Sequence, residues 1–192
     1  YGKWPFIRVF GVQELFSSLF SFFNGVPYLM LLTSRPVASR ARMGRIWQVN
    51  CGVYFNTWVQ STIFHIRESP VTEALYYHCA SMALFVALAT VLILHMPQSW
   101  PIMLCVFLTF VPSLTVWLCH VLYLSLVNFD YGYNMKVVVT VGICDSFLWL
   151  LWFIRNRKAK AFAFITAPFK VSHKKTLLPL GTDNHWEDRV VA

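Results

Sequence analysis

Charged side chains are scarce in this 192-residue chain. They make up 12% of the residues, whereas an average soluble domain has roughly 25%. Hydrophobic residues make up 57% of the chain, and the mean hydropathy is +0.56. This composition excludes an ordinary soluble domain and indicates an integral membrane protein. The net charge is +8, but the basic residues do not alternate with aromatic residues as they do on surfaces that bind nucleic acid. We therefore expect no nucleic-acid partner.

Paired cysteine motifs, internal repeats, GxxxG spacing and low-complexity segments are also lacking. The five cysteines all fall within apolar stretches, which favours free buried thiols over disulfides. A signal peptide is not recognisable either, because the chain opens on Tyr1 without a basic region, an apolar core and a cleavage site. We therefore expect a fragment or a processed form of a longer protein.

Long uncharged stretches are present instead. A helix needs about 20 predominantly apolar residues to cross a bilayer. Five stretches qualify, namely residues 15–33, 47–66, 74–96, 100–129 and 137–154. The sequence therefore predicts an all-α, polytopic transmembrane helix bundle with about five spans over residues 1–155. A basic tail that is cytosolic and partly disordered is expected over residues 156–192.

Basic residues gather on one side of this topology. The loop between the first two spans holds Arg35, Arg40, Arg42 and Arg45, and the segment after the fifth opens with Arg155, Arg157, Lys158 and Lys160. Short loops rich in Lys and Arg stay on the cytoplasmic side. We therefore expect a cytosolic C-terminus and an N-terminus that faces a lumen.

Polar residues gather at the expected lumenal ends of the spans. Ser61 and His65 are four residues apart, so they share one face of the second span. Glu73 opens the third span, and Asp130 follows the fourth. An imidazole inside a membrane is costly and is by default a functional-site hypothesis. Together these residues predict a site that opens toward the lumen.

Each of these residues also has a structural interpretation. His65 could bond to a neighbouring span, and Ser61 could serve close helix packing. Glu73 could be a surface acid in the first turn of a helix, and Asp130 could form a turn. These alternatives stay open from the sequence.

Two polar residues lie deeper in the predicted spans. Asp145 is near the centre of the fifth span, and we expect it to face the bundle and bond to Ser or Thr groups. His120 lies about 15 Å below Asp130 at a helical rise of about 1.5 Å per residue. We expect its ring to support packing.

Several motifs resemble one family in combination and in order. They are the YGKWPF run at residues 1–6, GVQE at 11–14, STIFHIR at 61–67, TEAL at 72–75 and FDYGYN at 129–134. Over residues 1 to about 155 the chain resembles the post-GPI-attachment-to-proteins factor 3 family. That family is grouped with alkaline ceramidases in the CREST superfamily of seven-span membrane lipid hydrolases.

The resemblance implies remodelling of glycosylphosphatidylinositol (GPI) anchors in the Golgi or endoplasmic reticulum membrane, by metal-assisted hydrolysis of the sn-2 acyl ester of the anchor lipid. It implies zinc as the cofactor, with His65 as a metal ligand, Ser61 as its polar partner, and Glu73 and Asp130 as further catalytic candidates. The implied partners are membrane lipids and GPI-anchored proteins.

Two departures from the family pattern support a second hypothesis. Tyr76 stands where relatives have aspartate, and the His-x-x-x-His pair that completes the relatives' metal site is missing, since His173 and His185 are twelve residues apart. A non-catalytic relative that binds lipid or assists trafficking, and has lost the metal site, therefore stands beside the lipid esterase. A transporter or receptor is disfavoured, because the polar residues gather at one end rather than along a path.

Overall fold

The computed structural model describes residues 8, 10–33, 43–127 and 129–156. Several sequence predictions fall outside these residues. They concern the first motif run, three of the four loop arginines, and residues 157–192 of the expected tail with His173 and His185.

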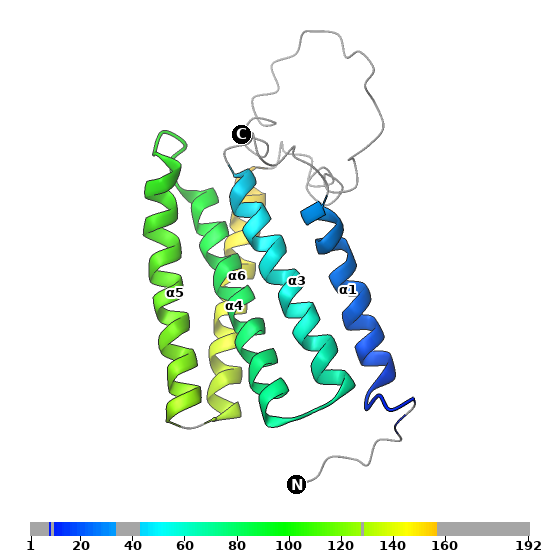
Figure 1. Ribbon diagram of the computed structural model, residues 1–192. Helices are drawn as coiled ribbons and strands as arrows, with labels where there is room; N and C mark the ends of the chain where they lie inside the picture. Colours follow the sequence, from blue (N-terminus) through cyan, green and yellow to red (C-terminus); the bar gives the residue numbers. More distant parts are fainter. Residues whose placement is uncertain (1–7, 9, 34–42, 128, 157–192) are drawn as a thin grey trace, which may run out of the picture.

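The described residues form a bundle of five α-helices that run side by side (Figure 1). The helices are α1 (Leu15–Thr33), α3 (Gly44–Ile66), α4 (Pro70–His95), α5 (Ile102–Leu126) and α6 (Tyr131–Arg155). Helix α4 packs against α3, α5 and α6, while α1 packs against α3. No strand pairs with another in this part of the chain, and the all-α prediction is confirmed.

Local sequence signals set the beginnings of α4 and α6. Ser69 and Thr72 form a capping box, in which the Ser69 hydroxyl accepts the Thr72 N–H at 3.2 Å and the Thr72 hydroxyl accepts the Ser69 N–H at 2.9 Å. Pro70 occupies the first turn, where no backbone N–H is needed. Asp130 caps α6, so that helix begins at Tyr131, six residues before the predicted span at 137–154.

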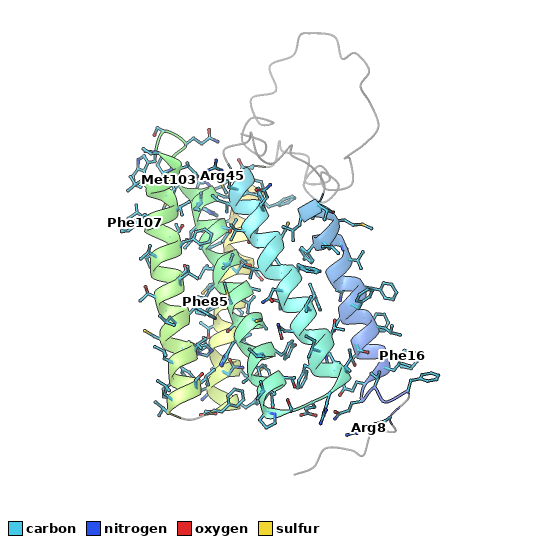
Figure 2. The ribbon with its side chains drawn as sticks, in the orientation of Figure 1. Arg8, Phe16, Arg45, Phe85, Met103 and Phe107 are labelled. Carbon is cyan, nitrogen blue, oxygen red and sulfur yellow. The ribbon has the colours of Figure 1, made fainter. Side chains whose placement is uncertain are left out.

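Helix α4 supplies most of the buried core. Its small residues Ala83, Ala87 and Ala89 are buried and let neighbouring helices approach closely. Phe85 is buried on the same helix, whereas Met103 and Phe107 lie on the outer side of α5 (Figure 2) and are 69% and 62% exposed. Large apolar side chains on the outside of a bundle suit contact with lipid.

Four of the described helices are long and apolar enough to cross a membrane: α1, α4, α5 and α6. The chain is therefore a multi-pass membrane protein. The remaining predicted span corresponds to α3, which lies between α1 and α4 but carries several polar residues. One of them, Asn50, donates to the Thr90 hydroxyl of α4 at 2.8 Å. That α3 also crosses the bilayer stays a prediction.

Candidate functional site

His65 is bound by a carboxylate from the start of α1. The Nδ1 atom of His65 lies 2.7 Å from Oε2 of Glu14, and the two side chains are 21% and 28% exposed. Because a carboxylate only accepts hydrogen bonds, Nδ1 carries the proton of this contact. In the neutral ring, Nε2 then holds the free lone pair. The arrangement orients the imidazole and leaves a basic nitrogen for a ligand or a proton.

Backbone contacts place Glu14 beside His65. The N–H of Gln13 donates to the Ile66 carbonyl at 3.1 Å, and the N–H of Glu14 donates to the His65 carbonyl at 3.0 Å. The side-chain amide of Gln13 donates to Oε2 of Glu68 at 3.2 Å and accepts the Glu68 N–H at 3.0 Å. These four bonds fasten the start of α1 to the end of α3. We call this end of the bundle, where α1, α4 and α6 begin, the His65 end.

Ser61 lies one turn before His65 on α3 and is buried. Its hydroxyl oxygen lies 2.9 Å from that of Ser21 on α1, and either group can donate. The helices approach closely nearby, since a Cβ on Gly25 would lie 3.3 Å from the Cβ of Trp58. Ser61 therefore has the contacts of a packing residue, and its catalytic role stays a prediction.

Aromatic rings flank the imidazole. Phe64 and Tyr76 stack with ring centroids 5.2 Å apart and an interplanar angle of 4°. The His65 ring lies 5.3 Å from Phe64 and 6.4 Å from Tyr76. Tyr76 is therefore a neighbour of His65.

Glu73 and Asp130 lie at the same end of the bundle but have different contacts. Glu73 makes no side-chain hydrogen bond or ion pair within the described residues and acts electrostatically on Tyr77, one turn further along α4. Oδ1 of Asp130 accepts the Tyr133 N–H at 3.1 Å, as a helix cap does. Neither carboxylate bonds to His65 or Glu14. Their catalytic roles stay predictions.

His120 ties α5 to α6. It is 3% exposed, and its Nε2 atom lies 3.1 Å from Oδ1 of the buried Asn134. Its ring also packs on Tyr133, with centroids 5.4 Å apart. The predicted packing role of His120 agrees with these contacts.

The contacts of Asp145 differ from the prediction. The residue is half-buried, and its Oδ1 atom is buried without a hydrogen-bond partner in the described part of the chain. The predicted bond to Ser or Thr is therefore wrong for these residues. Asp145 lies close enough to the phenol of Tyr54 on α3 to interact with it electrostatically.

A zinc site needs at least three protein ligands. Across residues 8, 10–33, 43–127 and 129–156, no group of three or more His, Cys, Asp and Glu side chains could hold a metal ion. His65 with Glu14 on Nδ1 has the form of a metal-binding histidine with its orienting carboxylate. One such pair is too few donors, so the described residues do not by themselves fit zinc.

Sequence reasoning did not assign a role to Glu14, although the residue lies in one of the motif runs. A carboxylate at the start of a helix has an ordinary explanation as a partner of free backbone N–H groups. Only the folded position of α1 brings it to His65.

Comparisons with known proteins agree on one family. The model of the Per1-like family matches residues 1–180. The protein PER1 homolog of Schizosaccharomyces pombe is 39% identical over 166 residues, covering 83% of this chain and 49% of the relative. The GPI-specific phospholipase A2-like PGAP3 of Bos taurus is 35% identical over 162 residues, covering 82% and 50%. The human protein of the same name is 32% identical over 160 residues, covering 82% and 49%.

The chain spans about half the length of the curated relatives it matches. No solved structure matches it.

Proposed function

This chain belongs to the Per1-like family, and from that membership we propose that it remodels GPI anchors by hydrolysing an acyl ester of the anchor lipid. The observation that carries the proposal is the His65–Glu14 pair, an oriented imidazole at one end of a membrane bundle. The names of the relatives supply the lipid class, since several are called GPI-specific phospholipase A2-like. The chain acts, in this proposal, on the lipids of GPI-anchored proteins.

The pair can move the protons that ester hydrolysis requires. Nε2 of His65 accepts a proton from a water molecule while the water oxygen attacks the carbonyl carbon of the ester. Glu14 stabilises the positive imidazolium through the Nδ1–H bond, as the carboxylate of a catalytic triad does. The imidazolium then gives the proton to the departing lipid oxygen. The products are a fatty acid and a lysolipid.

The position of the pair suits a lipid substrate. His65 is the last-turn basic residue of α3, so it lies near the end of the bundle rather than at its centre. The acyl ester of a phospholipid lies just below the headgroups, at a similar level. With the basic loops on the cytosolic side, the His65 end faces the lumen of the Golgi or endoplasmic reticulum.

A non-catalytic role is the second candidate. It is supported by Tyr76 at the position where the family resemblance leads us to expect an aspartate. It is also supported by the His65–Glu14 pair, since within the described residues this pair is too small a set of donors for a metal site. In this reading the His65 end binds the anchor lipid without cleaving it, and the chain assists trafficking of anchored proteins.

Fatty-acid release separates the two candidates. The purified full chain in nanodiscs is given a GPI lipid, and free fatty acid is measured by mass spectrometry. We expect release by the parent, a loss of about 100-fold or more in His65→Ala, and little change in His95→Gln. His95 is the matched control, because its Nδ1 atom bonds to the Val91 carbonyl at the other end of α4. A folded parent that binds the lipid but releases nothing supports the non-catalytic candidate.

A further inference from the structure

Five aromatic rings form a continuous row at the His65 end. The row consists of Phe64, Tyr76, Tyr77, Phe129 and Tyr131, which come from α3, α4, the connection between α5 and α6, and the first turn of α6. Successive centroid distances are 5.2 Å from Phe64 to Tyr76, 5.3 Å from Tyr76 to Tyr77, and 5.9 Å from Tyr77 to both Phe129 and Tyr131. We call these five residues the aromatic row.

The row begins at the proposed site and leads away from it. Phe64 and Tyr76 both contact the His65 ring, whereas Phe129 and Tyr131, at the far end, are 39% and 54% exposed. A phospholipid whose ester lies at His65 must extend its headgroup over the adjoining end of the bundle. The row offers a surface of ring faces and phenol hydroxyls for that headgroup.

Two carboxylates flank the row. Glu73 interacts electrostatically with the Tyr77 phenol, and Asp130 lies between Phe129 and Tyr131 in the chain. Asp130 uses Oδ1 for the helix cap, and its side chain is exposed. The row therefore pairs aromatic faces with negative charge, which complements a ligand that has both sugar C–H groups and a cationic amine.

We propose that the aromatic row with Glu73 and Asp130 binds the amino-sugar headgroup of a glycosylated phosphatidylinositol and selects it over plain phosphatidylinositol. A GPI lipid joins its inositol to an amino sugar whose amine is protonated at neutral pH. The sugar ring stacks on the exposed aromatic faces, and the carboxylates neutralise the amine. The identity of the lipid rests on the proposed function.

A simpler role for the rings is that of an interfacial aromatic belt, which anchors a helix end at the headgroup level. A belt does not distinguish one headgroup from another. Selectivity for the amine-bearing sugar is therefore the property that separates the two roles.

The test measures binding rather than turnover. The full chain in nanodiscs is titrated with glucosaminyl-phosphatidylinositol, its N-acetylated form and phosphatidylinositol, all with the same acyl chains. We expect the parent to bind the amine-bearing lipid about tenfold more tightly than phosphatidylinositol, with the acetylated form between them.

Substitutions in the aromatic row test the contribution of the rings to this preference, and substitutions of the two carboxylates test the contribution of the charge. Tyr131→Ala should lower the preference about three- to tenfold, while Tyr131→Phe keeps the ring and most of the preference. Glu73→Gln and Asp130→Asn should reduce discrimination between the amine and its acetylated form without changing phosphatidylinositol binding. Asparagine preserves the helix cap, so Asp130→Asn tests the charge alone. Phe107→Ala on the outer side of α5 is the control and should change nothing.

Equal affinity of the parent for the three lipids would overturn the proposal and leave the rings as a belt. The same preparations also report hydrolysis, so the two proposals fail separately. If the parent hydrolyses the GPI lipid but binds the three lipids equally, the aromatic row is not a headgroup site, and the proposed function still stands. If the parent prefers the amine-bearing lipid but releases no fatty acid, the aromatic row remains a headgroup site and the proposed esterase activity is refuted.

Discussion

Oε2 of Glu14 and Nδ1 of His65 lie 2.7 Å apart although 51 positions separate the two residues in the chain. The contact joins the start of α1 to the end of α3, and the backbone bonds of Gln13 and Glu14 hold it in place. The pair is thus a product of how two helices meet. The effect of these contacts on fatty-acid release and their effect on the free energy of unfolding can be measured separately.

Glu14→Gln tests the chemistry of the pair. Glutamine can still accept the Nδ1–H bond, but it has no negative charge to stabilise the imidazolium. We expect fatty-acid release to fall about 10- to 100-fold, while the thermal unfolding temperature in detergent stays close to that of the parent. A rate equal to the parent's would show that Glu14 only packs beside His65.

Gln13→Ala tests the fastening of α1 to α3. The substitution removes both side-chain bonds to Glu68 and leaves the backbone bonds of residue 13 in place. We expect the free energy of unfolding to fall by about 1–2 kcal/mol, measured by denaturant titration in mixed micelles.

The control for this variant is Thr115→Ala, since among the described residues the Thr115 hydroxyl bonds only to the Val111 carbonyl, on the exposed side of α5. Its unfolding free energy should change by less than about 0.5 kcal/mol. Equal effects of the two substitutions would mean that the Gln13 contacts add nothing to stability.

His120→Ala tests a histidine with structural contacts. Its removal leaves the buried Asn134 oxygen without the Nε2 partner and opens a cavity between α5 and α6. We expect the free energy of unfolding to fall by about 2–4 kcal/mol. In the fraction that stays folded, binding of the anchor lipid should persist. Loss of lipid binding with unchanged stability would instead place His120 in the site.

Metal content tests the cofactor implied by the resemblance. His65 and Glu14 alone are too few donors for zinc. A metal site confined to the described residues should therefore hold well below one equivalent of zinc, measured on the purified full chain by mass spectrometry of the metal. The same amount should remain in His65→Ala. A full equivalent in the parent that disappears in His65→Ala would show that residues elsewhere in the chain complete a zinc site around His65.

Hydropathy predicted much of the fold because each long apolar stretch has few ways to bury its backbone except as a helix. The bounds of α1 agree with the predicted span at 15–33. The start of α6 differs from the predicted span at 137–154. Residues 131–136 are polar enough to resemble a loop, but they are helical and Asp130 is the N-cap. Hydropathy measures where a helix meets lipid rather than where it begins.

The site was harder to predict than the fold. The spacing of Ser61 and His65 places both on α3, but their partners Ser21 and Glu14 come from α1, and the packing angle of two helices is not encoded in spacing. Asp145 could not be predicted either, since its buried Oδ1 atom has no hydroxyl partner within the described residues and the residue interacts electrostatically with Tyr54 of α3.

Hydrolysis in water labelled with oxygen-18 tests the central claim most directly. If His65 activates water, the fatty acid released from a GPI lipid by the parent acquires one labelled oxygen in its carboxyl group, and His65→Ala releases almost none. A released fatty acid without the label, or a labelled product formed equally fast by His65→Ala, would contradict the account.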